Sequence, residues 1–264
     1  MFDIDACAVA AAVTDEENIC VIAGTWSINE YISRTPVLDR SVMMNSLFCI
    51  PGYYLVEESS PTSAGNNEWF IGLFMEEEKR LARERGISIY ELMEEMAGAA
   101  GEGGQGVVFL PHIYGSNYNP QARACFVGLD ATATRAQVIR AVREGIVFCH
   151  MVHVEKLLKN RTRTAAVRLA GGAANSRAWA QMFADVFQLP VEIVDVKEMG
   201  ALGCAMAAAV ASGVYKDLKD AAKHMGEIKY RLEPDPARAE TYARKYLRYR
   251  RASEALDGIW KDFT

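Results

Sequence analysis

Two adjacent glycines, Gly171 and Gly172, constrain the fold of this chain more than any other feature. They lie between a β-leaning segment, 166–170, and a segment, 175–187, whose apolar residues recur at helical spacing. A second strand-like run at 191–194 and a second helical run at 199–214 follow. This β-α-β-α order predicts parallel strands in one sheet, because a crossover helix connects neighbouring parallel strands in that way.

Antiparallel strands are expected earlier in the chain. Two β-rich runs within 18–34 bend at Ala23-Gly24-Thr25, and the runs "SLFCI" and "YYLVE" flank a turn at Pro51-Gly52. We expect further helices at 3–14, from 67 to about 99, from 135 to about 158 and from 236 onward, and a strand at 107–111. No linker divides the chain, so the sequence predicts one α/β domain over residues 1–264, with a mixed sheet flanked by helices.

Charge and cysteine usage favour a small-molecule function. The chain has 264 residues, 50% of them hydrophobic, a formal net charge of -5 and a pI near 5.5. A basic surface for nucleic acid or an anionic membrane is therefore not expected. The six cysteines stand singly, mostly in apolar runs, which indicates buried, reduced thiols and a cytoplasmic location.

Two other patterns receive a structural interpretation. The most apolar run, "MGALGCAMAAAVASGVY" at 199–215, is too short to span a bilayer comfortably, and we expect a packed interior helix. His150 and His153 lie on one helical face without a third ligand nearby, so we expect core or surface residues there and no metal site.

The glycine pair is itself a candidate binding element. A turn without side chains lets backbone N–H groups reach a ligand, and the start of the following helix favours an anion or a polar ring edge. The alternative is a tight turn in which Asn175 or Ser176 caps the helix. The spacing is not the G-x-G-x-x-G fingerprint, and no acidic residue stands where it would hold a ribose, which disfavours a dehydrogenase-like dinucleotide domain.

Two further candidates lie near the amino terminus. Gly24 and Thr25 form a turn between β-rich runs, where an amide and a hydroxyl can meet phosphate oxygens. Asp3 stands just ahead of a helix, where its carboxylate can act as general base on a hydroxyl. Its alternative role is an ordinary N-cap, with Asp5 complementing the helix dipole.

In their order along the chain these motifs resemble the carboxy-terminal half of the FGGY carbohydrate kinases. The resemblance runs from about Asp3 to about Gly213 and rests on "FLPHIYG", "NPQARACFVGL", "RAVREGIVF", "LAGGAANSRAWAQMFADVFQLPV" and "EMGALGCAMAAAVASGVY". It implies an actin-like and hexokinase-like ATPase lobe, a ribonuclease H-like fold, in a kinase whose two lobes close on ATP and a sugar. The segments "FDIDACA" and "GTWSINEY" are most similar to pentulose kinases of the L-xylulose type.

The resemblance also implies roles for individual residues. Asp3 falls on the catalytic base, which accepts the proton of the sugar hydroxyl as it attacks the γ-phosphoryl of ATP, with Mg²⁺ neutralising charge. Gly24 and Thr25 fall on the hairpin that contacts the phosphates. The expected adenosine and nucleotide-cleft residues are Ala64, Gly65, Gly171, Gly172, Ala173, Asn175 and Ser176.

The sequence departs from the family at several points. Ser116-Asn117 stand where many members carry Glu-Arg, and Ala124 stands where a glycine is usual. Nothing resembles the Asp-x-Gly-Thr phosphate loop or the sugar-binding lobe, so we expect the isolated chain to be inactive and to contact sugar mainly through a missing amino-terminal lobe. The alternative is a non-catalytic nucleotide-binding or interaction module, a truncated kinase remnant. The assembly state, a homodimer included, stays open.

Overall fold

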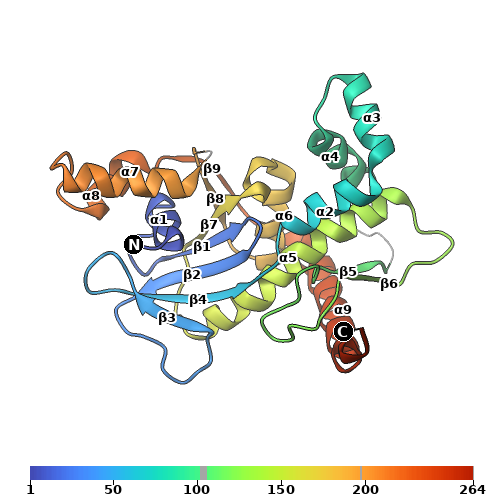
Figure 1. The fold of residues 1–264 in the computed structure, drawn as a ribbon, viewed down its shortest axis with the longest axis horizontal. Helices are drawn as coiled ribbons and strands as arrows, with labels where there is room; N and C mark the ends of the chain where they lie inside the picture. The colour runs from blue at the N-terminus through green and yellow to red at the C-terminus, as the bar shows by residue number, and fades with distance from the viewer. Residues whose placement is uncertain (102–105, 197, 264) are drawn as a thin grey trace.

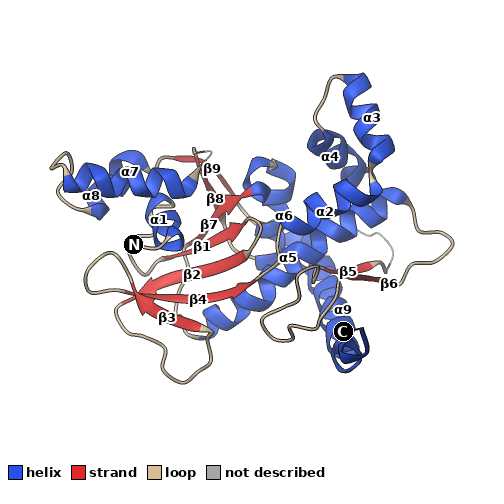
Figure 2. Ribbon diagram, viewed as in Figure 1, coloured by secondary structure: helices blue, strands red, loops and turns tan. Residues whose placement is uncertain are grey.

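The structure, a computed structural model, describes residues 1–101, 106–196 and 198–263. Its strands are β1 (Asn18–Ala23), β2 (Ser27–Ser33), β3 (Met44–Leu47), β4 (Tyr54–Ser60), β5 (Val108–Leu110), β6 (Cys125–Val127), β7 (Ala166–Gly171), β8 (Val191–Val194) and β9 (Ile228–Leu232). Seven of them form a central sheet in the order β3-β4-β2-β1-β7-β8-β9 (Figure 1, Figure 2). β5 and β6 form a separate antiparallel pair.

The sheet is mixed, as predicted. The first four strands pair antiparallel, whereas β7 runs parallel to β1, and β8 runs parallel to β7. The parallel register sets Gly171 opposite Ala23, so the carboxyl ends of β7 and β1 meet at one edge. Open α/β sheets bind ligands at such an edge, and this arrangement positions the candidate site.

Helices cover both faces of the sheet (Figure 1). On one face lie α1 (Asp3–Ala10), α7 (Met199–Ala211) and α8 (Leu218–Met225); on the other lie α5 (Arg135–Lys159) and α6 (Arg177–Phe187), with α9 (Ala239–Leu256) packed behind them. α2 (Gly65–Phe74), α3 (Glu76–Arg85) and α4 (Ile89–Ala99) follow β4 beyond one end of the sheet, and α4 packs on α5. The 3-10 helices are η1 (Gly172–Asn175), η2 (Pro236–Arg238) and η3 (Asp257–Phe263).

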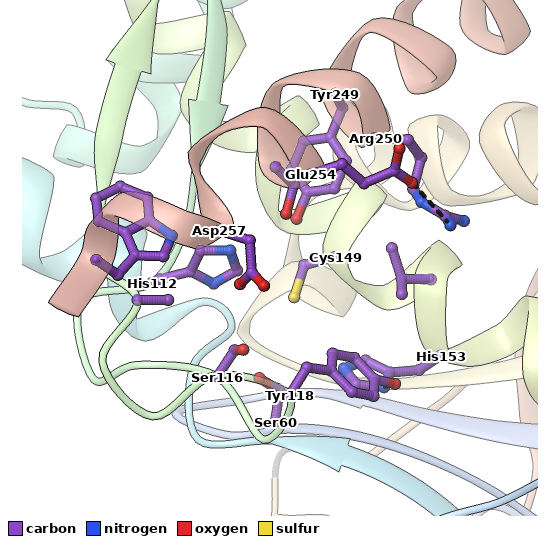
Figure 3. Close-up of a pocket in the computed structure, with 14 residues that line it drawn as sticks. Ser60, His112, Ser116, Tyr118, Cys149, His153, Tyr249, Arg250, Glu254 and Asp257 are labelled. Carbon is purple, nitrogen blue, oxygen red and sulfur yellow. Dashed lines mark hydrogen bonds and ion pairs between the residues drawn. The ribbon is translucent and has the colours of Figure 1, made fainter.

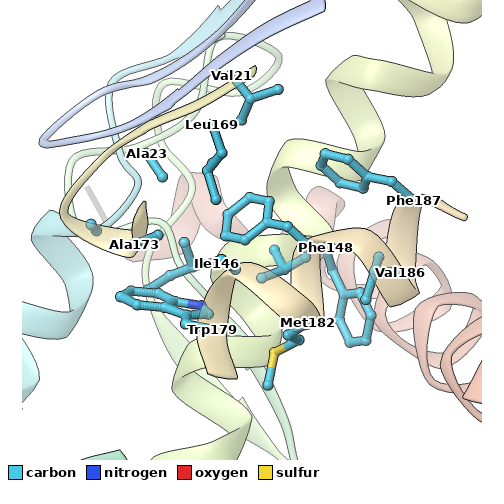
Figure 4. Packing of buried hydrophobic residues seen from close by; sticks show 14 of the residues in the cluster. Val21, Ala23, Ile146, Phe148, Leu169, Ala173, Trp179, Met182, Val186 and Phe187 are labelled. Carbon is cyan, nitrogen blue, oxygen red and sulfur yellow. The ribbon is translucent and has the colours of Figure 1, made fainter. Parts of the chain in front are cut away.

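Side-chain alternation along the strands divides the core into two apolar clusters. Val21 and Tyr31 belong to the cluster with α5 and α6, whereas Cys20 and Ile32 belong to the cluster with α1 and α8. The first cluster is the larger. Figure 4 shows its centre, where strand residues meet the inner faces of α5 and α6: Val21, Ala23, Leu169, Ile146, Phe148, Trp179, Met182, Val186 and Phe187.

The structure corrects several element predictions. The segment 67–99 is not one helix: Gly86, in the left-handed region at φ +67°, ends α3, and the Ser88 hydroxyl accepts the Glu91 N–H at 3.1 Å to begin α4. α1 ends at Ala10 rather than near residue 14. β6, α8 and β9 were not predicted from the sequence.

The prediction of a packed interior helix at 199–215 is wrong. Of the 13 residues of α7, only Gly203 and Met206 are buried, because α7 packs one narrow face on α1. All six cysteines are free, but the prediction of buried thiols holds only for Cys20 and Cys149. Cys204 on this helix is exposed, and the others, Cys7, Cys49 and Cys125, are partly buried. Within the described residues no helix combines the length and apolarity needed to cross a membrane.

Candidate functional site

Gly171 ends β7 in a conformation that glycine alone adopts readily. Its φ is +83°, and a Cβ there would lie 2.5 Å from the carbonyl oxygen of Ala23 and 2.9 Å from the amide nitrogen of Gly24. The glycine turn after β7 is therefore held directly against the turn between β1 and β2. This first glycine serves the close approach of two backbones.

Gly172, in contrast, has room for a Cβ atom. A Cβ there would make only ordinary contacts, 3.7 Å from the Ala64 Cβ. The Ser176 hydroxyl accepts the Trp179 N–H at 3.1 Å and donates to Glu94 Oε2 at 3.0 Å, so Ser176 is the cap of α6. The capping interpretation is thus confirmed for Ser176, and it does not explain why position 172 has no side chain.

A cavity of about 620 Å³, named cavity I here, opens beside Gly172. Its volume lies within the range of small-molecule sites. Its walls come from the turn after β7, the starts of α2 and α6, and helices α4 and α5: Ala64, Asn67, Glu68, Ser88, Tyr90, Glu91, Glu94, Arg143, Gly172, Asn175, Ser176 and Trp179.

Three residues of this lining carry buried polar atoms without a partner. They are Asn67 Oδ1, Arg143 Nε and Trp179 Nε1, none of which has a hydrogen-bond partner within the described part of the chain. A buried polar atom left unpaired costs about 1–3 kcal/mol. A ligand that supplies the missing hydrogen bonds in cavity I is therefore favoured.

The lining of cavity I carries one cation, Arg143, and three carboxylates, Glu68, Glu91 and Glu94. The Arg143 guanidinium carbon lies 5.4 Å from the centre of the Trp179 ring, an arrangement that attracts a cation to an aromatic face. Burial lowers the pKa of the Arg143 guanidinium, and the negative charge of Glu94 opposes that shift. Cavity I thus combines an indole, a buried cation and a glycine turn, which suits a planar ring, whereas its three carboxylates do not favour anionic groups inside the cavity.

Cavity II, of about 490 Å³, lies on the other side of the same turn. Gly171 and Asn175 line it, together with an ion pair in which Lys229 Nζ lies 2.9 Å from Asp195 Oδ1. Asn175 lines both cavities. The turn 171–176 is therefore accessible from two sides.

The turn between β1 and β2 completes this edge of the sheet. The Ser63 N–H donates to the Thr25 carbonyl oxygen at 2.9 Å, and a Cβ at Gly65 would lie 3.6 Å from that same oxygen. Thr25 itself is exposed. The predicted phosphate hairpin, Gly24 and Thr25, therefore lies between the start of α2 and the glycine turn.

His150 forms hydrogen bonds beside this hairpin, to β2 and to the loop before α2. Its Nδ1 lies 2.7 Å from Asn29 Oδ1, and its Nε2 lies 2.7 Å from Ser63 Oγ. Burial holds the pKa of His150 well below its usual range, so Nδ1–H donates to Asn29 and Nε2 accepts from Ser63. His150 and His153 are both core residues, and no group of three His, Cys, Asp or Glu side chains in the described ranges is placed to hold a metal ion.

Asp3 is the first residue of α1, and its carboxylate is exposed. The N-cap residue is Phe2, and the Asp5 carboxylate, at the third helical position, accepts the Phe2 N–H at 2.8 Å, so the N-cap interpretation of Asp3 is wrong. Burial raises the pKa of the Glu30 and Glu57 carboxyls, and the nearby charge of Asp3 adds to both shifts. Asp3 therefore lies near the paired strands β2 and β4, outside the linings of cavities I and II.

The structure brings most of the predicted site residues to one edge of the sheet. The exceptions are Asp3, on α1, and Ala173, whose side chain is buried in the core. Asn67, Glu94 and Arg143 were not identified from the sequence, because they lie in three separate helices that meet only in the folded chain.

Comparison with known proteins gives a consistent assignment. The chain is 34% identical over 261 residues to the L-xylulose/3-keto-L-gulonate kinase of Escherichia coli K12, an alignment that covers 98% of this chain and 50% of that protein. It is 28% identical over 248 residues to the autoinducer-2 kinase of the same organism, covering 91% of this chain and 46% of that protein. The crystal structure of xylulose kinase from Rhodospirillum rubrum superposes with a TM-score of 0.83 and 25% identity, over 98% of this chain and 51% of that one.

The chain thus spans about half the length of the curated relatives it matches. Its fold is also that of a Plasmodium falciparum glycerol kinase solved with ADP, at a TM-score of 0.76 and 19% identity, over 96% of this chain and 50% of that one. Residues 19–212 match the C-terminal domain of the FGGY family of carbohydrate kinases, and the chain belongs to that family.

Proposed function

We propose that this chain is the ATP-binding lobe of a kinase that transfers the γ-phosphoryl group of ATP to a hydroxyl of a pentulose or a related ketose or polyol. The observation that carries this proposal is cavity I, whose lining includes Gly172 and three residues with unpaired buried polar atoms. The names of the relatives, L-xylulose kinases among them, support a pentulose as acceptor.

In this proposal the purine and ribose occupy cavity I. Asn67 and Trp179 offer an amide oxygen and an indole N–H to ring or ribose groups, and Gly172 leaves room for the ring. The backbone of the turn 171–176 and the hairpin of Gly24 and Thr25 face the phosphates, as backbone turns that bind anions do.

Asp3 is the proposed base. Its carboxylate is exposed and accepts the Ile4 N–H at Oδ1, 3.0 Å away, so the second oxygen can accept the proton of an acceptor hydroxyl. Mg²⁺ in phosphoryl transfer is held largely by phosphate oxygens and water, with one or two carboxylates. We therefore propose that it arrives with ATP, since the described residues offer no cluster that would hold it alone.

Within the described chain, the linings of cavities I and II do not include Asp3. The chain spans about half the length of its curated relatives, and we propose that groups that hold the acceptor sugar in line with the γ-phosphoryl belong to the half that it does not span. We propose weak ATP binding without turnover for the isolated chain, and a cytoplasmic location, which the six free cysteines support.

Calorimetric titration of the chain with ATP and Mg²⁺ tests the nucleotide site. The variant Gly172→Val extends a side chain into cavity I from a position where a Cβ fits, so it should fold and lose binding. Its matched control is Gly72→Val, on α2, where a Cβ meets nothing within 4 Å. Unchanged affinity in Gly172→Val would place the nucleotide elsewhere.

An ADP-release assay tests catalysis. The chain is assayed with a panel of ketoses and polyols, alone and fused to the amino-terminal half of the Escherichia coli relative. Sugar-dependent turnover only in the fusion, lost in its Asp3→Asn variant with ATP affinity retained, supports the proposal. ATP binding without turnover in either form would favour the alternative, a non-catalytic nucleotide-binding module.

A further inference from the structure

A third cavity, named cavity III, lies apart from the candidate nucleotide site. Its volume is about 310 Å³, and it shares no lining residue with cavities I and II. Its walls come from the end of β4, the loop after β5, the middle of α5, the end of α9, and η3 (Figure 3). The proposed kinase mechanism uses none of the residues that line it.

His112 gives cavity III a buried polar wall. The residue is 7% exposed, and its Nδ1 has no hydrogen-bond partner among the described residues. Burial lowers the pKa of the His112 imidazole to about 4, so the ring is neutral near pH 7 and carries one donor and one acceptor nitrogen. Figure 3 shows its ring beside the carboxylate of Asp257.

The charges around cavity III disfavour an anionic ligand. The Arg250 guanidinium is already engaged, with Nη1 3.0 Å from Glu155 Oε2 and Nη2 3.4 Å from Glu254 Oε1. Asp257 accepts a hydrogen bond from Asn119 Nδ2 at 2.8 Å and adds a second carboxylate to the lining. Two carboxylates and one guanidinium line the cavity, so a phosphate or carboxylate group would meet net repulsion.

The remaining lining is uncharged. Burial raises the pKa of the Cys149 thiol to about 12, so it stays protonated. The Tyr118 hydroxyl donates to Glu58 Oε2 at 2.7 Å. Val152 and Trp260 add apolar surface. Neutral donors and acceptors therefore stand beside hydrocarbon and aromatic groups.

We propose that cavity III binds a small uncharged polyhydroxylated molecule, a polyol or a sugar. A hydroxyl group both donates and accepts, which matches the neutral imidazole of His112 beside the carboxylate of Asp257. An ammonium group has no acceptor for an imidazole N–H and would lie near the Arg250 guanidinium. The volume lies at the small end of the range for ligand sites, which limits the size of the occupant.

Histidine-selective ¹⁵N NMR of the whole chain tests this proposal, because the sequence has only four histidines. Xylitol, ribitol, sorbitol and D-xylose are titrated separately, with hexylamine and xylulose 5-phosphate as charged probes. We expect at least one uncharged probe to shift the His112 ring signals saturably in the millimolar range, while the signals of His224, exposed on α8, stay fixed. No saturable shift with any uncharged probe, or a tighter response to either charged probe, would overturn the proposal.

Two variants locate the binding by calorimetry. His112→Phe keeps a ring but removes both nitrogens, and it should weaken the responding polyol by at least about ten-fold. Ala122→Leu extends the wall of cavity III and should abolish binding even if His112→Phe does not fold. His224→Phe is the matched control and should bind as the parent does. Parent-like affinity in a folded His112→Phe or Ala122→Leu variant would place the polyol outside cavity III.

Discussion

The two faces of the central sheet are formed by the same strands, but they differ in the size of the apolar cluster that the helices bury on them. Toward α5 and α6 the core contains wholly buried large side chains such as Phe183, Ile146 and Leu157. Toward α1 and α7 the cluster is smaller, although it includes Ile32 and Leu55, and Gly203 of α7 lies against the backbone of Ala6. Large side chains bury more apolar area, so the α5 face should supply most of the stability.

The buried titratable groups also differ between the two faces. On the α5 face, His150 is neutral because burial holds its pKa well below its usual range. On the α1 face, burial holds the pKa of Glu30 well above its usual range, and the adjacent Glu57 adds to the shift. The proposed base, Asp3, thus belongs to the less stable face, which also carries the buried acids.

The largest expected effect on the free energy of unfolding comes from truncating one fully buried side chain on each face. Phe183 is fully buried, with its ring 5.4 Å from that of His150 and 5.5 Å from that of Phe187. We expect Phe183→Ala to lower the free energy of unfolding by about 4 kcal/mol, and Met206→Ala on α7 by about 2 kcal/mol, because α7 can move into the space. Urea denaturation measures both, and equal losses would remove the distinction between the faces.

A pair of helix glycines gives the next largest effect. A Cβ at Gly145 of α5 would lie 2.3 Å from the Phe109 carbonyl oxygen, and one at Gly203 of α7 would lie 2.0 Å from that of Ala6. Because α5 is enclosed and α7 is free on its outer side, Gly145→Ala should cost about 3 kcal/mol and Gly203→Ala about 1 kcal/mol.

Hydrogen exchange separates these two glycine variants further. Gly203→Ala should speed exchange in α1, which carries Asp3, and leave α5 unchanged. Gly98→Ala is the control, since a Cβ there meets nothing within 4 Å. A larger loss of stability in Gly203→Ala than in Gly145→Ala would show that α7 is held as rigidly as α5.

The sequence predicted the α5 face better than the α1 face, for a physical reason. In α6 the apolar residues recur with helical period, so its inner side follows from the pattern, and Trp179, Phe183 and Phe187 are buried as expected. In α7 almost every residue is apolar, so the pattern does not specify a buried side. β6, α8 and β9 were missed because they are short and half exposed, and their order depends on neighbouring elements.

Only some residues of the candidate site could be predicted from the sequence. The glycine turn and the hairpin were identifiable because their function depends on local backbone, which short motifs encode. Arg143 and Asn67 were not, since their unpaired buried atoms exist only after α5 and α2 pack at the sheet edge. The hydrogen bond from the N-cap residue Phe2 to Asp5 was missed because two aspartates stand two residues apart, and sequence alone does not assign the bond.

Burial shifts the pKa values of His150 and Glu30 in opposite directions. Their contributions to the pH dependence of folding stability should therefore partly cancel. Below pH 6.5 the unfolded state protonates His150 while the folded state does not, so stability falls as the pH falls. Above pH 4.5 the folded state keeps Glu30 protonated while the unfolded state does not, so stability rises as the pH falls. The two slopes oppose each other between these values.

Replacing Glu30 by glutamine leaves the pH dependence of stability that His150 contributes without an opposing effect. In Glu30→Gln, the loss of stability on acidification from pH 6.5 to pH 4.5 should steepen by up to about 1.4 kcal/mol per pH unit relative to the parent. Urea denaturation across this window measures the slope. A slope identical to that of the parent would mean that the folded chain holds Glu30 ionised.

The smallest effect is expected on the outer side of α7. Ala201, Cys204, Ala205, Ala208 and Ala211 are exposed at helical spacing and form one stripe. Substitutions at exposed positions change stability by about 0.5 kcal/mol or less, so the double variant Ala205→Lys with Ala208→Glu should unfold as the parent does in urea. If the stripe is instead covered in solution by a second copy of the chain, the parent's stability should rise with protein concentration, and the double variant should lose that dependence. Sedimentation of both proteins at matched concentrations distinguishes the two cases, because only a covered stripe makes the parent heavier than the variant.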